Sequence, residues 1–277
     1  STVQQLPNHK TNFYSDFEEG GMKLSMMMSL EGYGDLPRTA EEAIEQCVLA
    51  NRILANEDVV DAFGHVGVRN PENSETFFQS RSLSPELVTK DDLLEIDLDG
   101  NVLTKTDMKP YGERIMHSAI LKARSDVNAV FHGHPHSVIP FSSTGVPIRP
   151  IAHFGGMFYD GIPLYDDYDV SSGMLIATPD EGERVARVLG KSRALLLRDH
   201  GCCVVGDSVP SLVMASIYLR DNAAIQLKAL ALGGPKYLSY EEGRQASKVM
   251  GSAMSLERAW TYWVGRAKRA MPDLLKK

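Results

Sequence analysis

Residues 131–137 read FHGHPHS, and they follow directly on the apolar run that begins at Val127. Three of the eight histidines of the chain lie within five positions here. A short apolar run bounded by glycine and proline is typical of a buried β-strand. Alternate side chains of a strand share a face, so His132 and His134 can point the same way, about 7 Å apart, and bind one ion. The motif therefore predicts a metal site at the end of a strand.

A second polar interruption supplies the candidate for a third ligand. The tripeptide Asp199-His200-Gly201 separates two apolar runs that both have the composition of strands. Such a break is typical of a loop that faces a cleft, and either Asp199 or Glu86 is available as a carboxylate beside the ligands. We therefore expect His200 to complete the set. For the other histidines, a hydrogen-bonded position in a loop or in the core is at least as good an explanation as a role at the metal site.

Composition limits what such a site can do. The chain has 277 residues, 43% of them hydrophobic, which is enough for a full core, and its net charge of −7 argues against a nucleic-acid groove. Its three cysteines show no CxxC spacing, so neither a disulfide framework nor a thiolate zinc site is indicated. The polar start and the lack of any apolar stretch of about 18 residues predict a cytoplasmic protein that does not act at a membrane.

Periodicity and turn signals divide the chain into two parts. Residues 1–38 are expected to form an N-terminal arm, and residues 39–277 one α/β domain with a C-terminal helical extension. Helical spacing predicts helices over residues 39–54, 111–124, 181–189, 208–232 and 240–271. β-rich runs predict strands over residues 62–68, 76–80, 93–98, 127–132, 194–197 and 202–205. Helices that alternate with short strands predict a mixed sheet between helical layers.

Four motifs, in this order and spacing, resemble the class II aldolase/adducin superfamily over about residues 39–235. They are Phe63-Gly-His-Val66, Ser84-Pro-Glu-Leu-Val-Thr89, His132-Gly-His134 and Leu196-Leu-Arg-Asp-His-Gly201.

The resemblance carries expectations for fold, site and assembly. It implies a single-domain α/β/α sandwich with a mixed sheet, usually assembled as a homotetramer with active sites between subunits. It also implies a divalent ion bound by His132, His134 and His200, and a catalytic carboxylate at Glu86.

Two departures from the sugar-phosphate aldolases of this superfamily point to another substrate. Those enzymes place Asn after the glycine and Ser two residues later, to bind phosphate, whereas this chain has His65 and Gly67. Those of the fuculose type also have a tyrosine acid where this chain has His153-Phe154. Together with the segment Ser80–Glu86, these departures resemble the branch that acts on hydroxylated aromatic acids. The substrate contacts expected for that branch are His65, Arg81, Ser82 and His153, with Tyr159 and Tyr168 as aromatic wall or phenol partner.

The branch contains two kinds of enzyme. Some are non-oxidative decarboxylases of hydroxylated aromatic dicarboxylic acids, in which the metal acts as an electron sink. Others are non-haem Fe(II) oxygenases of aminocoumarin antibiotic biosynthesis, which shorten 3-prenyl-4-hydroxyphenylpyruvate or a mandelate-type acid to 4-hydroxy-3-prenylbenzoate with O2. The whole-chain resemblance favours the oxygenase.

The metal and the remaining alternatives stay open. Three neutral imidazoles leave an ion its full charge and open positions, which suits Fe(II) with a chelating 2-oxo acid and O2. Mn(II) and Zn(II) fit the same ligands, although zinc has no redox chemistry. A class II aldolase is a further alternative. A non-catalytic adducin-like module is the last, because such a module is expected to lose the ligand histidines.

Overall fold

The computed structural model describes residues 36–275. The expected N-terminal arm therefore lies almost entirely outside the described residues, and the boundary at residue 39 stays a prediction. Within residues 36–275, no helix is both long enough and apolar enough to cross a membrane.

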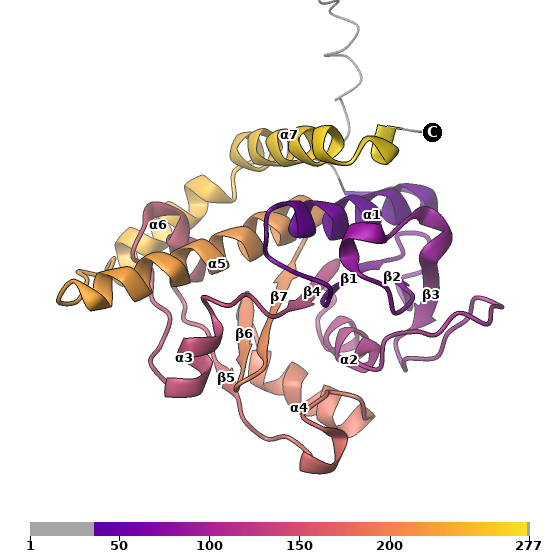
Figure 1. The fold of residues 1–277 in the computed structure, drawn as a ribbon, viewed down its shortest axis with the longest axis horizontal. Helices are drawn as coiled ribbons and strands as arrows, with labels where there is room; N and C mark the ends of the chain where they lie inside the picture. The colour runs from indigo at the N-terminus through magenta and orange to yellow at the C-terminus, as the bar shows by residue number, and fades with distance from the viewer. Residues whose placement is uncertain (1–35, 276–277) are drawn as a thin grey trace, which may run out of the picture. The chain divides into compact units, whose positions relative to one another are not determined.

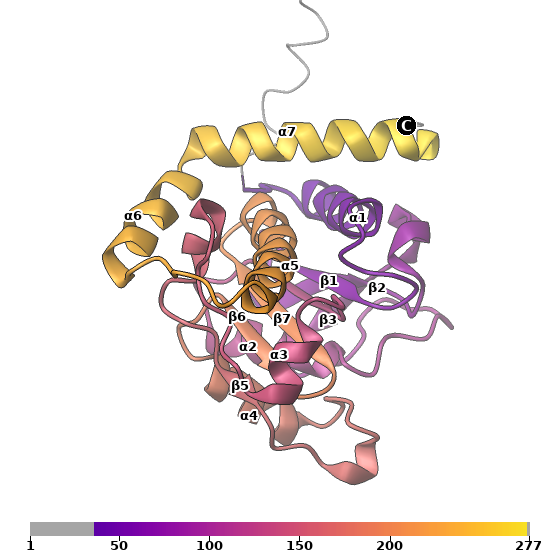
Figure 2. The same cartoon turned by 60° about the vertical axis from the view of Figure 1, so that its left-hand side comes forward.

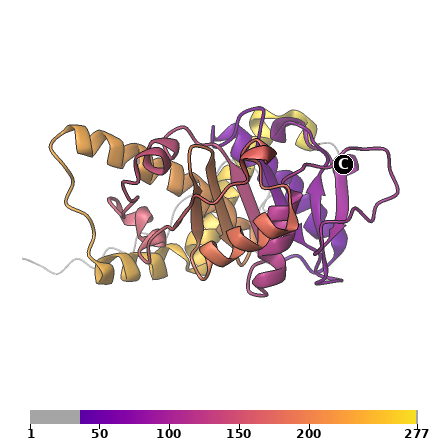
Figure 3. The same cartoon turned by 90° about the horizontal axis from the view of Figure 1, so that it is seen from below.

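A seven-stranded sheet runs through the centre of the domain, in the order β3-β2-β1-β4-β7-β6-β5. All neighbours are antiparallel except β5 and β6, so the sheet is mixed, as predicted. From below, the purple strands of the N-terminal half lie beside the orange strands of the C-terminal half (Figure 3). The strands are β1 (His65–Arg69), β2 (Thr76–Ser80), β3 (Leu93–Asp97), β4 (Ala129–Gly133), β5 (Leu164–Tyr165), β6 (Ala194–Leu197) and β7 (Gly201–Gly206).

Helices cover both faces of this sheet (Figures 1 and 2). One face is covered by α1 and α5, with α7 packed outside them, and the other by α2 and α4. The predicted α/β/α sandwich is confirmed. The helices are α1 (Ala40–Asn56), α2 (Arg114–Ala123), α3 (Ile139–Thr144), α4 (Pro179–Leu189), α5 (Val209–Ala231), α6 (Tyr240–Met250) and α7 (Ala253–Ala270).

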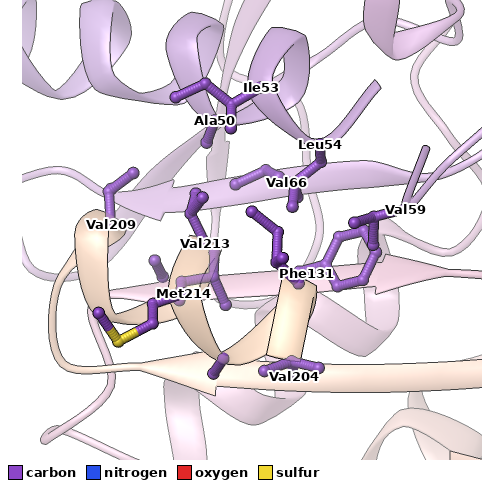
Figure 4. Close-up of a cluster of buried hydrophobic side chains, with 14 of the residues drawn as sticks. Ala50, Ile53, Leu54, Val59, Val66, Phe131, Val204, Val209, Val213 and Met214 are labelled. Atoms are coloured by element: carbon purple, nitrogen blue, oxygen red, sulfur yellow. The ribbon is translucent and has the colours of Figure 1, made fainter. Parts of the chain in front are cut away.

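Strict alternation along the strands divides the core between the two layers. Val66, Phe131 and Val204 face α1 and α5, and Figure 4 shows them packed against side chains of those helices. Val130 and Val205 point the other way, towards α2 and α4. Because successive strand residues alternate, the residue after Phe131 also faces the α2 layer. That residue is His132.

Three local differences from the expected elements have physical causes. The last helix is broken into α6 and α7, because the Ser252 side chain accepts the backbone N–H of Ser255 and starts a new helix after Gly251. The helix expected from residue 111 begins at Arg114, with Glu113 as its N-cap. The short elements α3 and β5 were not expected, since neither carries a clear periodic pattern.

Candidate metal centre

A row of polar side chains crosses three neighbouring strands on the face that α2 covers. His65 on β1 lies directly opposite His132 on β4, and Gln79 on β2 lies opposite Gly67, two residues beyond His65. All of these positions are buried in a sheet whose other interior side chains are mostly apolar. The register of three strands therefore brings together polar residues that are far apart in the sequence.

The three histidines predicted as ligands converge where β4 ends and β7 begins. These strands pair antiparallel, with Gly133 opposite Cys202, so His200 in the turn before β7 comes beside His134. One ring nitrogen from each of His132, His134 and His200 lies within 4.8 Å of the others. The Nε2 atoms of His132 and His134 are 3.2 Å apart. The structure thus brings together the set that the sequence predicted.

A hydrogen bond fixes which ring nitrogen of His132 faces His134 and His200. Its Nδ1 lies 3.0 Å from the Cys202 carbonyl oxygen, which can only accept, so Nδ1 carries the proton and Nε2 is bare. That bare Nε2 faces both His134 Nε2, at 3.2 Å, and Glu113 Oε2, at 3.3 Å. The bare Nε2 of His132 and the Glu113 carboxylate both carry lone pairs, which repel one another unless a cation lies between them. The side chains therefore fit a divalent metal ion.

The pKa values of two of these imidazoles support the same conclusion. Burial, followed by the repulsion that His132 and His200 would exert if they were protonated, lowers the pKa of His134 to about 4. Burial also lowers the pKa of His200. Both side chains are therefore neutral near pH 7, which is the form that binds metals.

Glu113 provides the carboxylate of the site, and the sequence analysis did not identify it. It caps α2, and its Oε1 lies 3.9 Å from His200 Nε2 while its Oε2 lies 3.9 Å from His65 Nε2. Burial alone would raise the pKa of Glu113, but the interaction of its carboxylate with the facing imidazoles of His132 and His65, when these are protonated, outweighs burial and holds that pKa far below its usual range. The side chain is therefore an anion at neutral pH.

The chain matches a known family over most of this region. Residues 45–227 match the family described as the Class II Aldolase and Adducin N-terminal domain. The chain belongs to this family. The solved L-fuculose 1-phosphate aldolase from Glaciozyma antarctica PI12 has the same fold, with a TM-score of 0.75 and 26% identity, over 88% of this chain and 98% of that one.

Three curated relatives of this class II aldolase/adducin chain are enzymes. Decarboxylase tropJ of Talaromyces stipitatus is 33% identical over 76% of this chain and 89% of its own length. The 3,4-dihydroxyphthalate decarboxylase of Arthrobacter keyseri is 27% identical over 84% of this chain and 97% of its own. A 4-hydroxy-3-prenylphenylpyruvate oxygenase/4-hydroxy-3-prenylbenzoate synthase of Streptomyces roseochromogenus is 27% identical over 68% of each chain. Both kinds of enzyme expected from the resemblance are thus among its relatives.

Glu86, the predicted catalytic carboxylate, is not brought to the histidines. It is exposed on the single turn η2 (Pro85–Leu87), at the surface of the domain. Among residues 36–275, Glu113 forms a second possible metal-binding group with His65 and His132, which shares His132 with the three predicted ligands. The structure therefore favours Glu113 for the role that the resemblance implied for Glu86.

Two of the predicted substrate contacts lie at the site. His65 is buried beside Glu113, with its ring centroid 5.3 Å from that of His132. The ring of Tyr168 lies 6.5 Å from that of His200, and its hydroxyl group is buried without a hydrogen-bond partner among the described residues. An unpartnered buried hydroxyl beside the histidines is suited to a bound ligand.

Arg81 and Ser82 lie on the loop after β2, at the side of His65. Arg81 is engaged in an ion pair with Asp92, at 2.7 Å, and Ser82 is exposed. Tyr111 connects this loop to the site: its ring lies 4.3 Å from that of His65, and its hydroxyl accepts the backbone N–H of Leu83. These positions suit the rim of the site, and their contact with substrate stays a prediction.

Tyr159 and His153 are not brought to the histidines within one chain. Tyr159 lines a cavity of about 250 Å³ together with Gly206, at the end of β7 remote from His200. At about 3.3 Å per residue, the length of β7 separates that cavity from the histidines by roughly 16 Å. His153 is exposed at the start of η4 (His153–Phe158). Neither contributes to the site of its own chain.

Proposed function

We propose that this chain is a metal-dependent decarboxylase of a hydroxylated aromatic carboxylic acid. The observation that carries the proposal is the convergence of ring nitrogens of His132, His134 and His200, with the Glu113 carboxylate 3.3 Å from His132 Nε2. The relationships to decarboxylase tropJ and to the 3,4-dihydroxyphthalate decarboxylase support the reaction and the substrate class.

The donor set suits this reaction. A divalent ion bound by His132, His134 and His200 supplies Lewis-acid chemistry, withdrawing electrons from a carboxylate and an adjacent hydroxyl group of the substrate. Because the three imidazoles are uncharged ligands, they do not reduce the positive charge that the substrate meets. Tyr168 adds an aromatic surface and a free hydroxyl beside His200.

Glu113 is suited to move the proton that decarboxylation requires. As an anion, it can accept the phenolic proton of the substrate at a carboxylate oxygen. It can return that proton to the ring carbon that loses CO2, and the C–C electron pair then restores the phenolate. The phenolate takes one proton from water, so the net change is replacement of a carboxylate by hydrogen.

The oxygenase is the second candidate, with Fe(II) and O2 and a prenylated 4-hydroxyphenyl 2-oxo acid as substrate. The 27% identical prenylphenylpyruvate oxygenase and the neutral three-histidine set favour it. Zn(II) would serve only the decarboxylase, because oxidative shortening needs a redox-active ion.

Aldolase action on a sugar phosphate is less favoured. The hydroxyl expected at position 67 for phosphate is replaced by Gly67, and the ring of His117 occupies the adjoining space. A non-catalytic module does not explain why all three ligand histidines are kept together with Glu113.

Measurements of CO2 release and O2 uptake distinguish the decarboxylase from the oxygenase. The apoprotein is loaded separately with Zn(II), Mn(II) and Fe(II) and incubated with 3,4-dihydroxyphthalate and with 3-prenyl-4-hydroxyphenylpyruvate, with and without O2. Release of CO2 from the first substrate in the absence of O2 supports the decarboxylase. O2 uptake with Fe(II) and the second substrate, with label from 18O2 in the benzoate, would replace it by the oxygenase.

We also expect a homotetramer with sites between subunits. Support comes from apolar side chains that α6 and α7 leave exposed, among them Val249, Met254 and Tyr262. Sedimentation equilibrium measures the mass directly. A monomer at micromolar concentration would contradict this expectation.

A further inference from the structure

Two buried polar side chains, those of His117 and Gln79, contact His65 on the side away from the metal ligands. His117 Nε2 is 2.8 Å from His65 Nδ1, and Gln79 Nε2 is 3.0 Å from the same atom. His65, His117 and Gln79 are all buried. Three such side chains in the core of the α2 layer contribute no apolar burial, and none of them is among the three ligand histidines.

The proton positions in this group follow from Glu113. His65 Nε2 faces Glu113 Oε2 at 3.9 Å, and a carboxylate can only accept, so the favourable tautomer of His65 has its proton on Nε2. Nδ1 is then an acceptor, as the amide N–H of Gln79 requires. His117 must donate to the same Nδ1 from its Nε2, which leaves its own Nδ1 bare. That Nδ1 has no hydrogen-bond partner among the described residues, consistent with an atom that carries no proton to donate.

Gly67 provides the room for this arrangement. A Cβ atom at Gly67 would lie 2.8 Å from His117 Nδ1 and 3.2 Å from Phe77 Cδ2. The phenyl ring of Phe77 is nearly parallel to the imidazole of His117, at 10°, with the two ring centroids 6.4 Å apart. His65, Gly67 and His117 therefore form one unit: the glycine admits the second histidine, and the second histidine orients the first.

We propose that His117 and Gln79 are positioning residues that hold His65 as the Nε2–H tautomer. The N–H is thereby directed at Glu113 and at an anionic oxygen of a substrate bound beside it. This role in substrate binding rests on the proposed function, whereas the tautomer does not.

The tautomer is measured by NMR of the zinc-loaded full chain labelled with 15N-histidine, with the His65 signals assigned from a His65→Gln spectrum. We expect a protonated Nε2 and a bare Nδ1. The double variant His117→Phe/Gln79→Leu removes both donors and should lose this preference. His117→Gln in the Gln79→Leu background returns one donor and should restore it. A proton on Nδ1 in the wild type, or an unchanged tautomer in the double variant, overturns the proposal.

Binding gives a second readout, with 3,4-dihydroxybenzoate as the probe and zinc content measured in each variant. The ligand histidines are untouched, so zinc content should not change, while probe affinity should fall about 10- to 100-fold in the double variant. Partial recovery in His117→Gln/Gln79→Leu is expected. A loss that this variant does not recover would indicate packing alone and overturn the proposal. If the wild type neither binds the probe nor decarboxylates, the proposed function fails, and the NMR result still decides the tautomer.

Discussion

Replacing Gly67 by alanine tests the packing on which the orientation of His65 depends. The added Cβ would lie 2.8 Å from His117 Nδ1, closer than carbon and nitrogen normally approach, and the His117 ring cannot turn away without breaking its 2.8 Å hydrogen bond to His65. Overpacking of this kind typically costs about 1–3 kcal/mol. The backbone at Gly67 is not in the left-handed region, so the cost is steric and not conformational.

A double-mutant cycle separates His117 from Phe77 as the source of that cost. In the His117→Ala background, the nearest of the three contacts is removed and those with Phe77 Cδ2 at 3.2 Å and Cε2 at 3.4 Å remain, so Gly67→Ala should cost less than about 0.5 kcal/mol. The measurement is denaturant unfolding of the four proteins at equal zinc saturation, followed by tryptophan fluorescence. An equal cost of Gly67→Ala in both backgrounds would refute the reasoning, because His117 would then not be the residue that the glycine accommodates.

Other predictions concern the metal and the proton. His200→Ala should lower metal affinity at least tenfold by removing one of three ligands, whereas the exposed His136→Ala should leave metal content unchanged; full occupancy in His200→Ala would contradict the ligand set. Glu113→Gln should lower turnover by about 10²- to 10⁴-fold and Glu86→Gln should not, as measured by CO2 release at equal metal content; the reverse order would return the role to Glu86. Because the pKa of His134 is lowered to about 4, protons compete with metal at this ligand only as pH falls towards 4, so the contribution of His134 to affinity, measured by competitive chelation as the difference between the wild type and His134→Ala, should show no step near the ordinary imidazole value of about 6.5.

The sequence was sufficient for the sheet and for the ligand histidines because both depend on local patterns. The apolar run that ends at His132 and the polar tripeptide around His200 each mark a strand end. Two histidines separated by one residue on a strand point to the same face of the sheet, independently of the rest of the fold. The pairing of β4 with β7 then brings the third histidine to them.

Glu113 and His117 could not be recognised in the same way. Their positions depend on where α2 crosses the sheet, and no local pattern specifies that crossing. The usable signal was an acidic residue just before a helix, with a histidine four residues later on the same helix face. Glu86 was preferred because it lay within a recognised motif, but its turn points to solvent.

The buried polar group on the α2 face also bears on stability. Gln79 Oε1 and His117 Nδ1 are buried without a partner among the described residues, and an unsatisfied buried polar atom typically costs about 1–3 kcal/mol. The same two side chains would contribute hydrophobic stabilisation if they were apolar, as their neighbours Phe77 and Val130 do. A core selected for stability alone would therefore place apolar residues at position 79 of β2 and position 117 of α2. The polar pair is explained by what it does to His65, because the orientation of one N–H beside Glu113 is the gain that offsets this cost.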